Sequence, residues 1–188
     1  MLKKLILIYS MLALTLLFAI SEPQIKLVMD QKVQEITTLL QDKSLDKESK
    51  QNSVYAIIDS IFDYRIMSKV SLGKQWKNFT EKQKEAFISK YEYKLKASYF
   101  DKLELYTDEK VLIKEIEKVK SNRIKVHSDI VGKDDTYEVI YKFYRAKEST
   151  DWLIYDVEIT GVSIIQTYRK QFSEFLRSKS IDELIESL

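Results

Sequence analysis

Several residue types that carry much of protein chemistry are scarce in this chain of 188 residues, which has no cysteine, one histidine, one proline and three glycines. The lack of cysteine excludes disulfides, thiol catalysis and cysteine-ligated zinc sites, and His127 alone leaves little for a histidine-rich metal site. Gly73, Gly132 and Gly161 lie far apart, which excludes a glycine-rich phosphate loop. A formal net charge of +2 is too small for a protein that binds nucleic acid over a broad basic face. Many enzyme classes are therefore disfavoured.

The first residues have the pattern of a cleavable export signal. Two lysines precede an apolar run from Leu5 to Ile20, and small residues stand at Ala19 and Ser21, the positions that a signal peptidase reads. The run is shorter than the ~18 residues of a membrane-spanning helix, which favours cleavage over a permanent anchor. We therefore predict a signal peptide at residues 1–21, export to the cell envelope, and one formally neutral domain at residues 22–188.

After this leader, the hydrophobic pattern predicts helices first, strands second and helices last. Apolar residues recur every three or four positions. This spacing predicts helices at about residues 23–40, 46–72, 80–106, 162–176 and 181–188. Gly73 stands where a left-handed residue would end the second helix, and Thr80 with Gln83 has the form of a capping box.

Between these helical segments the period changes from about 3.6 to 2, which indicates strands. Segments rich in valine, isoleucine and tyrosine alternate with polar residues at about residues 111–120, 124–130, 137–143 and 152–160. The polar stretch from Gly132 to Asp135 predicts a hairpin turn between the second and third of them. We expect an α+β fold whose sheet is antiparallel and has about four strands.

The carboxyl-terminal third also contains a recognisable motif. Residues 151–163 read DWLIYDVEITGVS and are followed by Tyr168-Arg169, by Phe172 and by a terminal Leu184-Ile185. This stretch resembles the closing signature of the MlaC/toluene-tolerance family, roughly W-x-x-Y-D-V-x-x-x-G-V-S and then Y-R-x-x-F. Earlier positions fall in the order of that family's L-G-x-x-W segment and the helix after it, namely Leu72, Gly73, Trp76, Gln83, Phe87, Tyr91, Leu95 and Tyr99.

The resemblance implies a fold and a function. The expected fold is a strongly curved antiparallel sheet wrapped by helices, an NTF2-like cone with an apolar cavity. The expected function is that of a periplasmic carrier of glycerophospholipid, with phospholipid as cargo and no other cofactor. The implied partners are an inner-membrane ABC transporter complex (MlaFEDB-like) and an outer-membrane lipoprotein complex (MlaA-like), and the implied role is to maintain the lipid asymmetry of the outer membrane. Neither catalysis nor nucleic-acid binding is expected.

A carrier of this kind needs an apolar interior, because each methylene group exposed to water costs ~0.8 kcal/mol. We expect the lining to come from the inward side of the sheet and from the long aromatic helix opposite it. The predicted lipid-binding residues are Tyr91, Leu95, Tyr99, Val126, Ile130, Val139, Tyr141, Trp152 and Ile154. Ordinary core packing is the alternative interpretation of each of them.

The motif residues themselves favour structural roles. Gly161 is expected to turn the chain sharply and Ser163 to cap the helix that follows. Asp156 is expected to accept hydrogen bonds from nearby backbone or from Arg169. Two other functions stay open at this point. One is an NTF2-like enzyme that uses Asp156 and a pocket tyrosine on a small apolar substrate. The other is a structural envelope protein anchored by an uncleaved leader.

Overall fold

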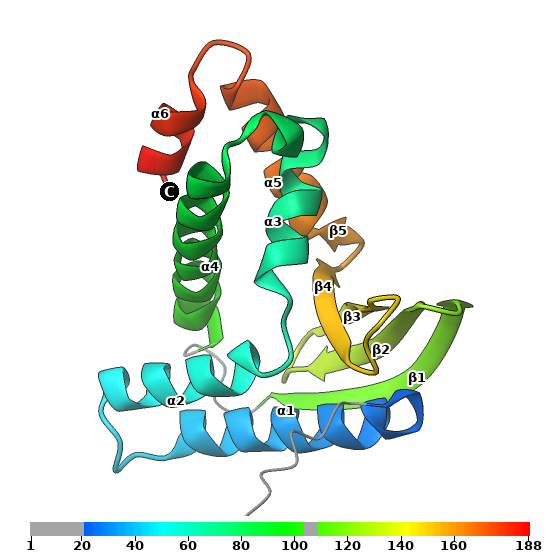
Figure 1. The fold of residues 1–188 in the computed structure, drawn as a ribbon. Coiled ribbons are helices and arrows are strands. Elements are labelled where there is room, and N and C mark those ends of the chain that lie inside the picture. Colours follow the sequence, from blue (N-terminus) through cyan, green and yellow to red (C-terminus); the bar gives the residue numbers. More distant parts are fainter. Residues whose placement is uncertain (1–20, 104–108) are drawn as a thin grey trace, which may run out of the picture.

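The computed structural model describes residues 21–103 and 109–188 (Figure 1). The signal peptide predicted at residues 1–21 therefore lies almost entirely outside the described residues, as does the end of the third predicted helix at Tyr106. Within the described ranges, no helix is both long enough and apolar enough to span a membrane.

The first two helices form an antiparallel pair along one side of the sheet (Figure 1). A short 3-10 turn at Glu22–Gln24 leads into α1 (Ile25–Gln41), which runs alongside the first strand, and α2 (Lys47–Asp59) returns beside it. The Asp46 carboxylate accepts a hydrogen bond of 2.7 Å from the Ser49 backbone N–H and so caps α2.

The prediction of a single helix at residues 46–72 is wrong, because this segment forms two helices with a break between them. Helix α2 ends at Asp59 and α3 begins at Tyr64 (Tyr64–Leu72). Between them, the Ile61 carbonyl accepts from the Ile154 N–H and the Asp63 N–H donates to the Ile154 carbonyl, both at 2.8 Å. The Asp63 carboxylate also accepts from the Ile66 N–H at 2.9 Å. These bonds satisfy backbone groups that a break would otherwise leave unpaired.

The remaining helices form a layer beside and above the sheet (Figure 1). A 3-10 segment (Gly73–Asn78) joins α3 to the long α4 (Glu81–Leu103), α5 (Ile164–Phe175) packs against α3, and α6 (Ile181–Glu186) packs against α4. Gly73 has a φ of 54°, as predicted for the end of a helix. The predicted capping box is confirmed, since the Gln83 N–H donates to Thr80 Oγ1 at 3.2 Å and the Thr80 N–H donates to Gln83 Oε1 at 3.0 Å.

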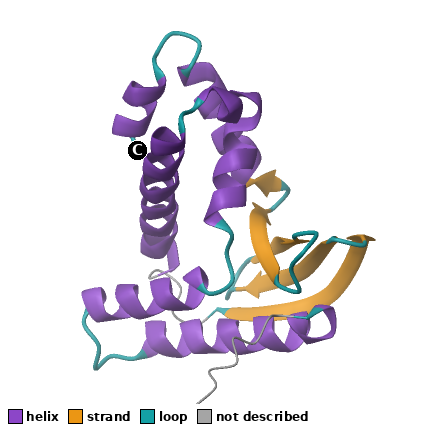
Figure 2. Cartoon of the chain, in the orientation of Figure 1, coloured by secondary structure: helices purple, strands orange, loops and turns teal. Residues whose placement is uncertain are grey.

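The sheet is antiparallel throughout and its strands follow chain order. Figure 2 shows the strands gathered in one part of the molecule, next to the helices. The strands are β1 (Lys110–Lys120), β2 (Arg123–Val131), β3 (Thr136–Arg145), β4 (Trp152–Ile159) and the two-residue β5 (Val162–Ser163). The predicted α+β class is confirmed, with the short β5 in addition to the four expected strands. Thr160 and Gly161 form the tight turn into β5, and both have positive φ angles, of 46° and 80°.

A bulge in β4 decides which of its side chains face the helices. Asp156 pairs with Lys142, but the next pair is Ile154 with Phe143, so Tyr155 is the extra residue. Trp152 and Ile154 are therefore buried before the bulge, and the adjacent residues Asp156 and Val157 are both buried after it. Such a bulge increases the local twist and bend of a sheet, and the strands curve visibly in Figure 1.

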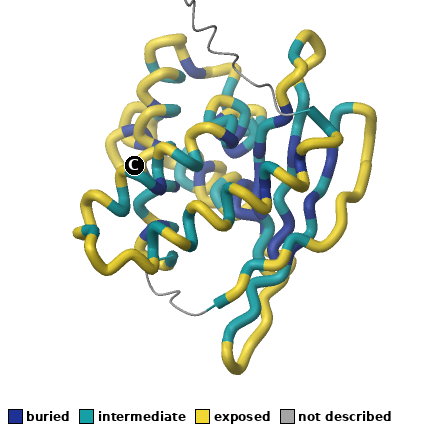
Figure 3. Tube along the Cα trace, turned by 90° about the horizontal axis from the view of Figure 1, so that it is seen from below, coloured by how far each residue is buried: buried dark blue, intermediate teal, exposed yellow. Residues whose placement is uncertain are grey.

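Aromatic side chains pack against one another inside the helical layer. Buried segments lie where the helices and the sheet face each other (Figure 3). The ring of Tyr91 lies 5.0 to 5.4 Å from those of Phe87, Tyr168 and Phe172. Its hydroxyl is hydrogen-bonded to Ser71 Oγ at 2.9 Å. A buried phenol with its polar atom satisfied is a stable core element.

The break before α3 can be tested through its cap. Asp63→Ala removes the acceptor for the Ile66 N–H, and we expect it to lower the free energy of unfolding by about 1 kcal/mol in urea denaturation. Asp151→Ala is the matched control, because the Asp151 side chain is exposed and forms no hydrogen bond with the described residues. Equal stability of the two variants would contradict the capping role of Asp63.

Candidate functional site

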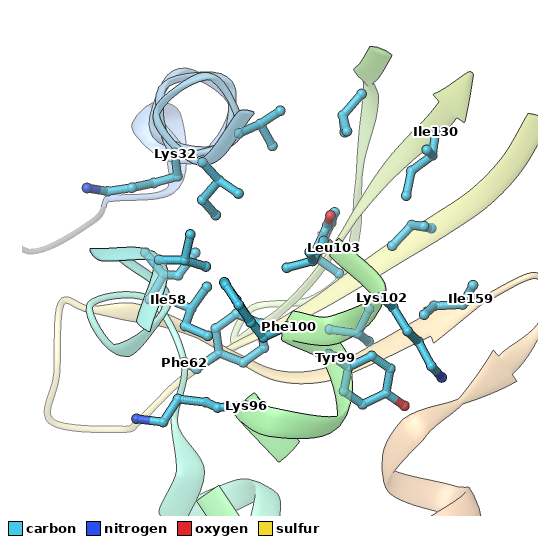
Figure 4. A pocket seen from close by; sticks show the side chains of 18 of the residues that line it. Lys32, Ile58, Phe62, Lys96, Tyr99, Phe100, Lys102, Leu103, Ile130 and Ile159 are labelled. Atoms are coloured by element: carbon cyan, nitrogen blue, oxygen red, sulfur yellow. The ribbon is translucent and has the colours of Figure 1, made fainter. Parts of the chain in front are cut away.

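An apolar cavity of about 280 Å³ lies between the helices and the sheet (Figure 4). It is enclosed by the α1–α2 pair, by the carboxyl-terminal half of α4, and by the side of the sheet that faces these helices. Its apolar lining includes Met29, Val33, Ile36, Leu40, Val54, Ile58, Ile61, Phe62, Met67, Leu95, Phe100, Leu103, Val111, Ile130, Val139, Val157, Ile159 and Ile164. This lining suits a hydrocarbon ligand and offers little to a polar one.

Four charged residues contribute to the lining, namely Lys32, Lys96, Lys102 and Glu109, and the three lysines lie at its edge. Lys32, Lys96 and Lys102 contribute to the wall, and their amino groups point away from the centre of the hollow in Figure 4. Lys96 Nζ is held by Asp59 at 3.0 Å and by Glu92 at 2.6 Å. Because long side chains can pack their methylene stems on apolar surface while the charge stays in water, these lysines leave the interior uncharged.

Tyrosine side chains add rings to the wall without adding charge. Burial raises the pKa of the Tyr99 and Tyr141 hydroxyls above the ordinary value of 10.0. The pKa of Tyr64 is also raised, first by burial and then by the neighbouring Asp59 carboxylate, to which its hydroxyl donates at 3.0 Å. All three phenols are therefore neutral at physiological pH.

The structure brings together five of the nine residues predicted to bind lipid. Leu95, Tyr99, Ile130, Val139 and Tyr141 line the cavity, whereas Tyr91, Val126, Trp152 and Ile154 do not. Tyr91 belongs to the aromatic cluster of the helical layer. Trp152 and Ile154 lie in the half of β4 beside which residues 61–63 run, and Val126 is fully buried in the core. Lipid contact by any of the nine stays a prediction.

Sequence reasoning missed the contribution of α1. Met29, Val33, Ile36 and Leu40 form one stripe of that helix and all line the cavity, although the stripe predicts only a core-facing helix. The spacing of these residues gives no sign that they face a cavity. Only the structure shows it, because Val33, Ile36 and Leu40 remain partly exposed although they face the interior.

Asp156 is a buried junction rather than a cavity residue. Its carboxylate accepts from Ser163 Oγ at 2.8 Å, from the Ile165 backbone N–H at 3.2 Å and from Lys142 Nζ at 3.1 Å. The expected hydrogen bond from the backbone is thus present, but the prediction of Arg169 as the alternative partner is wrong. The fold brings Lys142 across from Asp156 in the β3–β4 register, and Arg169 packs against Gly73 instead.

This arrangement gives the enzymatic alternative no support, because Asp156 does not line the cavity and three donors already surround its carboxylate. Ser163 caps α5 as predicted, with its Oγ accepting from the Gln166 N–H at 3.0 Å. His127 lies outside the cavity lining, 3.3 Å from a Glu117 carboxylate oxygen and 3.7 Å from a Glu138 oxygen. In the described part of the chain, no three histidine or acidic side chains are placed to hold a metal ion.

Comparison with known proteins gives a consistent result. A family model described as MlaC protein matches residues 30–188. The intermembrane phospholipid transport system binding protein MlaC of Haemophilus influenzae is 27% identical over 121 residues, which are 63% of this chain and 56% of that protein. The chain thus aligns with little more than half of the length of this relative.

A solved structure has the same fold. The phospholipid-binding protein of Ralstonia solanacearum, determined in complex with a phospholipid, superposes with a TM-score of 0.72. The match covers 85% of this chain and 92% of that one, at 17% sequence identity. The expected fold, a bent antiparallel sheet covered by helices, is therefore confirmed.

The structural role of Asp156 makes a quantitative prediction. Asp156→Ala leaves Lys142 and Ser163 short of a buried partner, and we expect it to lower the free energy of unfolding by about 3 kcal/mol in urea. Asp156→Asn keeps an acceptor oxygen and is expected to lose about 1.5 kcal/mol. An Asp156→Ala protein as stable as the unmodified chain would contradict the junction role.

Proposed function

The chain belongs to the MlaC family, and on that basis we propose that it carries phospholipid through the periplasm with the acyl tails in the cavity between α1, α4 and the sheet. The observation that carries the proposal is the mostly apolar hollow of about 280 Å³ with its lysines at the edge. The phospholipid in the structure of the Ralstonia solanacearum relative supports the same class of ligand.

The energetics of transfer explain why such a cavity is needed. Moving two ordinary acyl chains from a bilayer into water costs roughly 20 kcal/mol or more, at ~0.8 kcal/mol per methylene group. A carrier lowers this cost by surrounding the tails with apolar side chains. No covalent step is required, and none is proposed.

The cavity volume suggests how lipid enters. A volume of about 280 Å³ falls just below the range of roughly 300–1,000 Å³ common for small-molecule sites, so a diacyl lipid requires more space. The wall best placed to move is the α1–α2 pair, because the cavity-facing side chains Val33, Ile36 and Leu40 are only partly buried. We propose that this pair moves away from the sheet when the cavity is filled.

The headgroup is proposed to stay at the lysine-bearing edge in contact with solvent. Apolar burial is non-directional, so the tails would be held whatever the headgroup, and we expect broad tolerance among phospholipids. The proposed partners are an inner-membrane ABC transporter complex and an outer-membrane lipoprotein complex, between which the protein would help to maintain lipid asymmetry. Mass spectrometry of the mature amino terminus tests the proposed cleavage after Ser21.

Phospholipid loading is the direct test. Protein purified without detergent is extracted with organic solvent, and the extract is analysed by mass spectrometry. Val33→Trp places a large side chain in the cavity, and we expect the phospholipid bound per mole of protein to fall roughly tenfold, because the indole ring occupies space that the tails need. Leu27→Trp is the control on the same helix, because Leu27 is 59% exposed and does not line the cavity.

Two outcomes would overturn the carrier proposal. One is unmodified protein that contains no phospholipid and takes none up from vesicles. The other is a Val33→Trp protein that folds and loads lipid as well as Leu27→Trp does.

Cargo should also stabilise the fold, because filling the cavity gives its lining side chains packing partners. At a free lipid concentration one hundred times the dissociation constant, linkage predicts a gain of about 2.7 kcal/mol in the free energy of unfolding. Urea denaturation of lipid-loaded and lipid-depleted protein measures this gain. Identical curves for two samples of confirmed lipid content would show that the cargo does not contribute to the core.

A further inference from the structure

A second hollow, which shares no lining residue with the apolar cavity, has a different chemical character. It is a crevice of about 370 Å³ between α3, α5 and the adjoining ends of β2 and β3, where α3 and α5 lie side by side (Figure 1). Its lining consists of Ile66, Lys69, Val70, Gly73, Arg123, Tyr144 and Arg169. Three of these seven side chains are cationic and none is acidic.

Arg123 is held by two aromatic rings. Its guanidinium carbon lies 4.1 Å from the centre of the Tyr144 ring and 4.8 Å from that of Tyr155. Arg123 and Tyr144 are opposite each other in the β2–β3 register. Its Nη1 atom is buried and has no acceptor among the described residues. A fixed, buried donor on a charged group gains more from an incoming anion than an exposed flexible one does.

Arg169 is positioned by the absence of a side chain at Gly73. A Cβ atom at Gly73 would lie 2.9 Å from Arg169 Nε and 3.0 Å from Nη2, closer than real contacts allow. The guanidinium thus packs directly on the Gly73 backbone, whose φ of 54° also favours glycine. Gly73, Tyr155 and Arg169 all belong to the sequence motifs described above, yet none of them lines the apolar cavity.

The three cations of the crevice have no acidic partner among the residues that the structure describes. Lys69, Arg123 and Arg169 form no ion pair with any residue in the ranges 21–103 and 109–188. By contrast, the partly buried Lys96 and Lys142 each pair with two carboxylates. Like charges that share a crevice repel each other, and an anion placed among them removes that repulsion.

From this geometry we infer that the crevice is a binding site for a phosphate-type oxyanion, distinct from the cavity proposed to hold acyl tails. Arg123 supplies a guanidinium group fixed by two aromatic rings, and Arg169 supplies a second guanidinium group. Lys69 adds a flexible ammonium group at the rim. Guanidinium groups match phosphate oxygens in pairs of parallel hydrogen bonds. The oxyanion comes either from free phosphate or from the headgroup of a phospholipid in a membrane surface. The buried Nη1 of Arg123 can be reached by a compact anion more readily than by an extended acidic protein surface.

Titration with inorganic phosphate at constant ionic strength tests the site. Isothermal titration calorimetry measures the affinity, and the NMR signals of the arginine Nε–Hε groups report where the anion binds. Lys69→Gln/Arg169→Gln is expected to weaken binding at least about tenfold, because charged hydrogen-bond partners are lost. Lys133→Gln/Arg177→Gln removes the same charge from exposed positions outside the crevice and should bind as the unmodified protein does. Circular dichroism confirms that both variants fold.

A vesicle-binding experiment distinguishes between free phosphate and a lipid headgroup as the source of the oxyanion. Sedimentation is measured with phosphatidylcholine vesicles, with and without phosphatidylglycerol. Anionic vesicles that bind the control variant but not Lys69→Gln/Arg169→Gln identify the headgroup as a ligand. Equal vesicle binding by the two variants, together with crevice-dependent phosphate binding, identifies the free anion.

The proposal is overturned if phosphate binds equally to both variants, or does not bind saturably to the unmodified protein. It is also overturned if a polyglutamate peptide binds in a crevice-dependent way where phosphate does not, since that result indicates an acidic protein partner. The phosphate titration does not depend on acyl cargo, so its failure would leave the carrier proposal intact.

Discussion

Two backbone hydrogen bonds between Ile154 and the segment Ile61–Asp63 fix the break between α2 and α3 against the sheet. The segment runs parallel to β4 at this point and separates the two helices. On one side, α4 and α5 pack aromatic rings against one another, and Ser71 of α3 is hydrogen-bonded to the Tyr91 hydroxyl. On the other side, α1 and α2 face the sheet across the apolar cavity. The hollow thus depends on where the helix is interrupted.

Asp156 links the sheet to the helical layer. Through Ser163, Ile165 and Lys142 it connects β4 with the start of α5 and with β3. The bulge at Tyr155, next to it, lets residues on both sides of the bend face the interior. A buried carboxylate with several donors holds these elements in a defined geometry. Such a rigid region suits a protein in which the opposite wall, α1 and α2, is proposed to move around its cargo.

The two hollows differ in chemistry in the way expected for different ligands. The cavity has apolar walls and keeps its lysines at the edge, whereas the crevice combines arginine, lysine and tyrosine and is lined by no acid. Both involve residues of the sequence motifs, but different ones. Leu95 and Tyr99 face the cavity, while Gly73 and Arg169 meet at the crevice. A motif of one family can therefore report on more than one place in the fold.

Local patterns in the sequence determined much of this structure. Alternation located the strands, apolar spacing located α1, α4 and α5, and the cap residues at Thr80 and Ser163 marked helix starts, because these signals act over a few neighbouring residues. The motif at residues 151–163 was sufficient to identify the family. Only the tertiary structure decided that α1 forms a wall of the cavity while Tyr91 is solid core, and that Asp156 pairs with Lys142 rather than Arg169. An apolar stripe looks the same in sequence whether it meets another side chain or an empty space, and that difference is set by elements distant in the chain.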